Sequence, residues 1–195
     1  MGIGGGTLET TLRFGDGREA ELELDSVALS VGRVRPAGWS PRVTAGWITG
    51  GTMSQEGGTV HDFSGGFLIA AGLDKRLSPG GGASPAVDMS LGLSAAWAQT
   101  EQQGTGTEAD YTAADFRVGV RTMWPVGTRF FPYAAARVFG GPVNWNWNGD
   151  DVQGSDAHHY QLAVGAAAAF GRMALQLEWG ALGEQSLSAG VSALW

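Results

Sequence analysis

Apolar residues recur at every second position through most of this chain, and this period constrains the fold more than any other feature. One segment shows it with four large apolar residues whose neighbours are mostly charged or small: Phe116, Val118, Val120 and Trp124. A period of two is typical of a β-strand with two unlike faces. Ten strands are therefore predicted, near residues 7–14, 18–34, 41–53, 59–74, 86–100, 111–124, 128–140, 158–170, 172–181 and 186–195.

The composition is consistent with one domain built from such strands. The 195 residues include 33 glycines and no cysteine, and we expect a single domain over 1–195 with a flexible segment at 1–6. No apolar run approaches the roughly 18 residues that a membrane-spanning helix needs. Alternating strands can still cross a membrane, because only one of their faces meets lipid. The net charge of −7 argues against a nucleic-acid partner, and the lack of cysteine excludes disulfides.

Aromatic residues gather at both ends of the predicted strands rather than at their centres. One set comprises Phe63, Trp97, Phe116, Phe139, Tyr160 and Trp179, and the other comprises Trp124, Phe130, Phe170 and Trp195. The ten steps from Tyr160 to Phe170, at about 3.3 Å each and about 45° of tilt, span roughly 23 Å. This length is close to the roughly 25 Å apolar band of an outer-membrane barrel. The two sets are therefore predicted to lie at the two membrane interfaces.

The chain ends on an alternating strand that stops at an aromatic residue. Ser188, Gly190, Ala193 and Trp195 resemble the C-terminal insertion signal of bacterial outer-membrane β-barrels. With its aromatic girdles and alternating strands, the whole chain resembles the small barrels of OmpA/OmpX and opacity-protein type. The resemblance implies assembly by the outer-membrane insertion machinery and contact with lipid and lipopolysaccharide. It also implies an all-β fold, a transmembrane antiparallel up-and-down β-barrel, for which we predict ten strands, with eight as the alternative.

The connectors differ between the two sides of this predicted barrel. Two turns on the side of the chain ends are very short, whereas the longest polar connectors, 101–110 and 141–157, lie on the other side. Short periplasmic turns and longer outer loops are typical of such barrels. We therefore expect periplasmic termini, extracellular loops at 101–110 and 141–157, and a monomer in the bacterial outer membrane.

Charged residues are predicted to line the interior between small ones. Alternation assigns Glu9, Arg13, Asp88, Arg117, Arg121, Arg137 and Glu178 to this lumen network. Charges can face inward only where they are paired or wet. A paired network that fills the lumen favours a non-enzymatic barrel with a structural or surface role. The alternative is a narrow polar pore for ions or small solutes.

The second predicted strand breaks its own pattern. Leu22 and Leu24 share one parity, whereas Val27, Leu29 and Val31 share the other. A β-bulge near Asp25–Ser26 would reconcile the two sets. Alternatively, residues 18–24 project beyond the membrane, and the spanning part begins near residue 27.

Other functions find less support in the sequence. A soluble lipocalin-like barrel would place the apolar face inward, around a ligand. A hydrolase of omptin type needs acidic and histidine residues on facing strands, whereas Asp156 and His158 share one loop with Asp150 and Asp151. A hydrolase of the outer-membrane lipid A deacylase type needs a His-x-Ser pair, which His159 and Gln161 do not provide. We predict no catalytic residue, no cofactor and no metal site. Trp145 and Trp147 in the longest loop are predicted either to extend an interface belt or to form an adhesive surface.

Overall fold

The computed structural model describes residues 1–195 except 16, 36–37, 56–57, 82–83, 148–149 and 194–195. No helix in this part of the chain is long and apolar enough to cross a membrane. The described residues form twelve strands: β1 (Gly2–Phe14), β2 (Glu19–Gly32), β3 (Trp39–Gln55), β4 (Val60–Ser78), β5 (Ala86–Gln102), β6 (Glu108–Met123), β7 (Phe130–Gly140), β8 (Val143–Trp147), β9 (Asp150–Asp156), β10 (Tyr160–Phe170), β11 (Met173–Gly183) and β12 (Gln185–Ala193).

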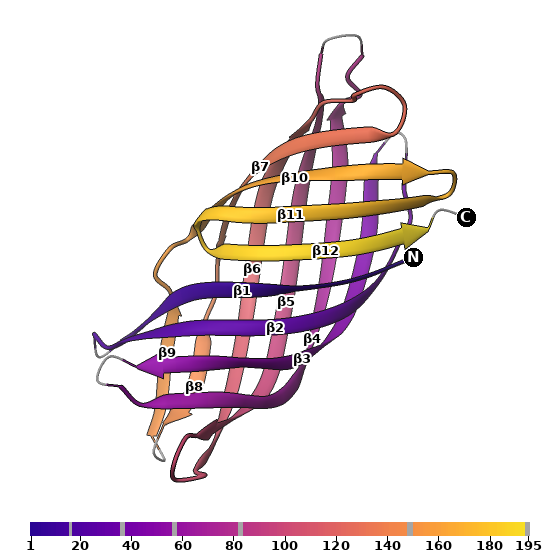
Figure 1. Cartoon of the computed structure of the whole chain (residues 1–195). Helices are drawn as coiled ribbons and strands as arrows, with labels where there is room; N and C mark the ends of the chain where they lie inside the picture. The colour runs from indigo at the N-terminus through magenta and orange to yellow at the C-terminus, as the bar shows by residue number, and fades with distance from the viewer. Residues whose placement is uncertain (16, 36–37, 56–57, 82–83, 148–149, 194–195) are drawn as a thin grey trace.

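Ten of these strands close into an antiparallel barrel, which we call the membrane ring (Figure 1). The order runs β12-β11-β10-β7-β6-β5-β4-β3-β2-β1, and β1 pairs with β12 to close the ring. The predicted all-β barrel of ten strands is confirmed. The segment 1–6 was expected to be flexible, but its residues 2–6 belong to β1 and pair with β12 on one side and β2 on the other.

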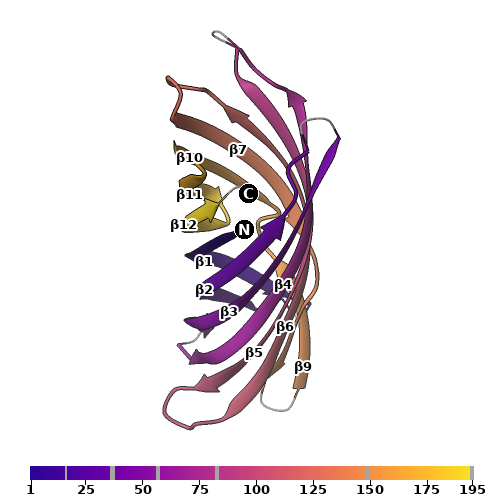
Figure 2. The same cartoon turned by 90° about the vertical axis from the view of Figure 1, so that its right-hand side faces the viewer.

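A second, smaller ring shares six strands with the first. Beyond its contacts with β12, β1 pairs with β9 through Leu12–Phe14, and β6 pairs with β8 through Tyr111–Ala113. Because β8 and β9 pair with each other, the strands β1 to β6, β8 and β9 also close on themselves. We call this part the cap ring, and we call the opposite opening, where the chain termini lie, the terminal end (Figure 2).

The two predicted long loops are mostly strand. The connector 141–157 contains the hairpin β8–β9, and β5 and β6 extend into 101–110 until only residues 103–107 remain between them. Polar composition led to the prediction of loops. These strands lie in the cap ring, where outward polar residues meet water instead of lipid.

The polarity of the wall reverses between the two rings. Along β2, odd-numbered side chains face outward throughout: Val27 and Leu29 are exposed in the membrane ring, and Glu21 and Glu23 are exposed in the cap ring. The even-numbered Leu22 is buried inside the cap. The broken parity of β2 therefore reflects a change of surroundings, as the second interpretation expects, although an irregularity is also present where the first interpretation placed a bulge.

A register shift marks the level of this reversal. Asp25 pairs with Gly50 and Ser26 with Ile48, so β3 contributes an extra residue, Thr49. Gly51, with φ of 128°, follows it, and a Cβ there would collide with the carbonyl oxygen of Glu23. Only glycine fits this close approach without strain.

The interior of the cap ring is a packed apolar core. Its buried members come from seven of the eight strands: Leu12, Phe14, Ala20, Leu22, Leu24, Ile48, Met53, Phe63, Ala98, Ala109, Tyr111, Val143 and Trp145. Val152 of β9 packs against them. Soluble barrels of about eight strands are filled by side chains in this way.

Candidate functional site

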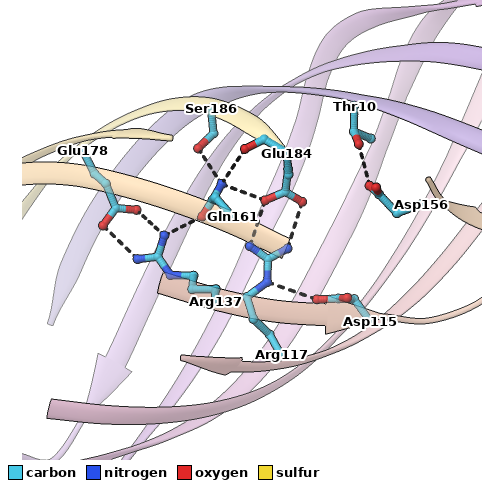
Figure 3. Close-up of polar contacts among 9 residues, drawn as sticks. All are labelled: Thr10, Asp115, Arg117, Arg137, Asp156, Gln161, Glu178, Glu184 and Ser186. Carbon is cyan, nitrogen blue, oxygen red and sulfur yellow. Dashed lines mark hydrogen bonds and ion pairs between the residues drawn. The ribbon is translucent and has the colours of Figure 1, made fainter. Parts of the chain in front are cut away.

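The lumen of the membrane ring contains a network of paired charges on one wall. The guanidinium of Arg137, on β7, donates two hydrogen bonds of 2.8 Å to the carboxylate of Glu178, on β11 (Figure 3). It also donates to Gln161 Oε1, on β10, at 2.6 Å. Antiparallel pairing places these three strands side by side, and alternation turns the three side chains inward. A bidentate pair of this kind fixes both partners.

A second ion pair lies closer to the cap ring. Arg117, on β6, donates two hydrogen bonds of 2.9 Å to Glu184, and its Nε lies 3.3 Å from Asp115 Oδ2 (Figure 3). The guanidinium carbon also lies 4.4 Å from the ring centroid of Phe139. Phe139 was predicted at the membrane interface, but it is buried and faces the lumen, where it packs against this cation.

The third cluster is centred on Asp88, on β5. Its carboxylate accepts hydrogen bonds from Arg76, on β4, and from Arg121, on β6, the latter at 3.0 Å. Arg121 also lies over the ring of Tyr133, 5.5 Å from its centroid. One carboxylate thus holds two guanidinium groups that would otherwise repel each other.

Sequence reasoning missed two members of the network. Arg76 was assigned to a connector, although β4 continues to Ser78 and turns this side chain inward. Glu184 lies between β11 and β12, in the turn after Gly183, whose φ is 77°. Alternation along a strand cannot assign a face to a turn residue, so no signal in the sequence marked Glu184.

Two predicted members of the network lie elsewhere. Glu9 and Arg13 are exposed on the outer surface of β1, and Arg13 pairs with Glu19 at 2.7 Å. Alternation assigned Glu9 and Arg13 to the interior, which would turn the residues between them outward. The structure instead turns Leu12 and Phe14 into the core of the cap, and the odd-numbered charges therefore face outward into water.

The opposite wall of the lumen carries almost no side-chain volume. Most of its inward positions on β12, β1 and β2 are glycine, alanine or serine, with Leu8 as the larger exception: Gly2, Gly4, Gly6, Ser26, Ala28, Ser30, Ser188, Gly190 and Ser192. Two cavities follow, of about 360 Å³ and 560 Å³. They share Arg42 and Asp74 in their linings, and the larger one reaches Met1 and Arg33 at the terminal end.

The cap closes this space at the other end. The smaller cavity extends as far as Asp115 and Arg117. Beyond them, Ala96 and Ala113 already pack against the apolar core. Trp145, which is 1% exposed, occupies that core and donates a hydrogen bond from Nε1 to Thr100 Oγ1 at 3.1 Å. The polar cavity of the lumen therefore lies directly beneath the apolar core of the cap.

Placing Trp145 in the core overturns both predictions made for it. The alternation that was thought to project its ring outward instead turns the ring into the cap, where it lies 6.2 Å from Phe14 and edge-on to His61 at 4.8 Å. The side chain of Trp147 lies outside the described part of the chain.

A histidine is buried in the same core. Both ring nitrogens of His61 lack a hydrogen-bond partner among the described residues. Burial lowers the pKa of His61 below its ordinary value, and the nearby charge of Asp62 opposes this shift only in part. His61 is therefore neutral in the folded cap, and charging it costs stability.

The remaining histidines do not assemble a hydrolytic site. Asp156 accepts hydrogen bonds from Thr10 Oγ1 at 2.6 Å and from the backbone N–H of His158 at 2.7 Å. The contact with Thr10 joins β1 to the end of β9 (Figure 3). Within the described residues, no group of three or more His, Asp or Glu side chains is placed to hold a metal ion.

Most predicted interface aromatics are exposed on the outer surface of the membrane ring: Trp97, Phe116, Trp124, Phe130, Tyr160, Phe170 and Trp179. Trp97 stacks on Phe67 with ring centroids 4.9 Å apart. Phe63 is an exception, because the register shift between Phe63 and Gly65 leaves it inside the cap, packed edge-on against Tyr111.

The proposed insertion signal is described only in part. Ser188 and Gly190 lie on β12 and face the lumen, and Ala193 ends that strand. Trp195 lies outside the described residues, so its place at the interface stays a prediction.

Comparison with known proteins identifies the fold. No protein-family model and no curated protein matches the sequence. Among solved structures, the transport unit of the autotransporter AIDA-I from Escherichia coli is similar, with a TM-score of 0.52 at 9% identity over 100% of this chain and 89% of that one. The β-domain of the Bordetella autotransporter BrkA has a TM-score of 0.50 at 14% identity, over 100% and 99% of the two chains.

The likeness to these structures extends to the fold alone. With the apolar outer band of the membrane ring, it establishes a transmembrane β-barrel of the outer-membrane kind. The neighbours are autotransporter β-domains, so the more specific resemblance to OmpA/OmpX barrels finds no support among them.

Proposed function

We propose that this chain is a non-enzymatic outer-membrane barrel that is closed to solutes and holds its cap ring at the cell surface. The observation that carries the proposal is the apolar core of the cap, to which all eight strands of the cap ring contribute. A water-filled pore needs a continuous polar path, and packed leucine, methionine and aromatic side chains exclude water. The charged network below the core stiffens the barrel instead of conducting.

The orientation belongs to the same proposal. The turn that joins β10 to β11 at the terminal end is only two residues long, whereas the cap ring rises from the opposite end. Periplasmic termini and an extracellular cap match the usual asymmetry of such barrels. The outward polar residues of the cap then face the polar layer of lipopolysaccharide and the medium.

A second candidate, a conduit, is favoured by the side-chain-poor wall of β12, β1 and β2. The cavities along this wall total several hundred cubic ångströms and reach the terminal end. This candidate requires the cap to open. The solved neighbours named as transport units share only the fold with this chain.

Planar-bilayer recordings decide between the two candidates. We expect the wild-type protein, shown to be folded by a heat-dependent shift in SDS gels, to give no unitary conductance steps. Removal of the β8–β9 hairpin opens the cap ring and should produce steps. Regular steps from the wild-type protein would refute the proposal. Silence from both proteins would assign the block to the charged network rather than to the cap, and would also refute it.

A further inference from the structure

The two ends of the barrel carry opposite charge on their outer surfaces. The cap ring exposes carboxylates, among them Glu9, Glu21, Glu23, Asp62, Glu101 and Asp110. The four connections at the terminal end, 33–38, 79–85, 124–129 and 171–172, contain no Asp or Glu. Five cationic side chains lie in these connections or beside them, and we call them the cationic rim: Arg33, Arg35, Lys75, Arg129 and Arg172.

The cationic rim lies at the same depth as a row of aromatic residues. Lys75 is the direct cross-strand partner of Trp39, and its ammonium lies 5.6 Å from the centroid of that ring. Arg129 immediately precedes the exposed Phe130, and Arg172 lies two residues after the exposed Phe170. Aromatic residues of this kind settle at the headgroup level of a membrane. Lys75, Arg129 and Arg172 therefore lie at the depth where these aromatic residues would meet lipid headgroups.

The cations of the rim differ from those of the lumen in their partners. Arg76, Arg117, Arg121 and Arg137 each pair with a carboxylate inside the barrel. Within the described part of the chain, no member of the cationic rim forms an ion pair. Four of the five are exposed, and Lys75 is half-buried against its ring. These charges remain available to an external anion.

We propose that the cationic rim binds the headgroups of anionic phospholipids in the leaflet at the terminal end. The five charges are distributed around the mouth, next to β2, β4, β7 and β11, and do not converge on one point. One polyvalent anion could not reach them together, whereas a shell of lipids meets each cation separately. The proposal rests on the transmembrane fold and does not depend on a closed lumen.

Spin-labelled lipids test this directly. The folded protein is placed in phosphatidylcholine bilayers that contain a trace of spin-labelled phosphatidylglycerol or phosphatidylcholine, and electron paramagnetic resonance gives the relative association of each lipid with the barrel. A basic residue at the surface contributes about fivefold in affinity for anionic lipid, and we expect a preference of that order at low salt. The preference should collapse at 1 M NaCl, where the screening length falls to about 3 Å.

Changing all five residues of the cationic rim to Gln should reduce the preference to about one. A matched pair of variants controls for net charge. Arg129→Gln/Arg172→Gln should lower the preference, and Arg13→Gln/Arg18→Gln at the cap should leave it unchanged. The heat shift in SDS gels shows whether each variant is folded, and the salt dependence of the wild-type protein serves as the test where a variant is not.

Three results would overturn the proposal. One is equal association of both lipids with the folded, inserted wild-type protein. Another is a preference that survives the five substitutions. The last is a preference that inorganic phosphate removes at an ionic strength where NaCl does not, because the rim would then bind free phosphate rather than the lipid surface. Conductance is measured separately, so failure here leaves the closed barrel untouched.

Discussion

Trp145→Ala should open the cap while the membrane ring stays closed. The side chain is 1% exposed, contacts Phe14 and His61, and is bonded to Thr100. Truncation of a buried tryptophan to alanine costs about 3–5 kcal/mol. The loss falls on the cap, because no part of the Trp145 ring reaches the lumen network. If the cap opens locally, its open population should rise by roughly two to four powers of ten.

Limited proteolysis of protein folded in lipid vesicles measures this population. When the cap opens and closes faster than the protease cuts, the cleavage rate follows the equilibrium between the two states. We expect faster cutting within β8 and β9, together with an unchanged heat shift of the remaining barrel. Trp179→Ala is the matched control, since Trp179 lies on the lipid-facing surface and is 56% exposed.

A small effect would refute the reasoning. If cap cleavage rises less than about tenfold in Trp145→Ala, or rises equally in Trp179→Ala, the cap is not a cooperative core. Loss of the heat shift in Trp145→Ala would show instead that the two rings unfold as one unit.

Three further predictions concern the lumen and the cap. Asp88→Ala leaves Arg76 and Arg121 without their shared carboxylate. Because both guanidinium groups are partly solvated, we expect the free energy of unfolding in urea to fall by about 2–4 kcal/mol, and by less in Asp88→Asn. Burial lowers the pKa of His61, so His61 in the open cap binds a proton before His61 in the closed cap does as the pH falls. The stability of the cap should therefore be constant above a pH of about 6.5 and decrease below it. His61→Phe should remove this pH dependence from the rate of proteolysis. Gly165→Ala should lower the free energy of unfolding by about 1–3 kcal/mol, because its Cβ would meet the Tyr133 ring and, at 2.6 Å, the Leu177 carbonyl oxygen; an unchanged free energy would show that neither contact constrains this position.

The membrane ring follows from the sequence because lipid imposes a strict rule on each strand. Along β10 and β11, apolar residues such as Val164 and Leu175 face lipid, and the alternation assigned both faces correctly. Arg117, Arg137 and Glu178 were assigned to the lumen by the same rule, and the structure brings them into one network. Which of these side chains pair with one another depends on the register between strands, and the pattern of a single strand cannot reveal that register.

The cap ring escaped prediction because a soluble barrel obeys the opposite rule on the same strands. Leu22 and Val27 are both apolar, yet one meets a protein core and the other meets lipid. No local pattern distinguishes these surroundings. Phe63 was misassigned for a different reason, because the register shift after it reverses the face that odd-numbered residues of β4 occupy. The hairpin of β8 and β9 was mistaken for a loop because its pairing with β1 and β6 joins positions far apart in the chain.

The two rings, which separate at β1 and β6, are also completed at different points along the chain. The cap ring contains no described residue after Asp156, whereas the membrane ring is complete only when β12 meets β1. The seam that seals the barrel against lipid therefore joins the first and last strands, and the seam that seals the cap joins β1 to a hairpin from the interior of the chain. Because β1 pairs with β9 at one seam and with β12 at the other, the chain contains every strand of the cap ring before it reaches the strand that closes the membrane ring.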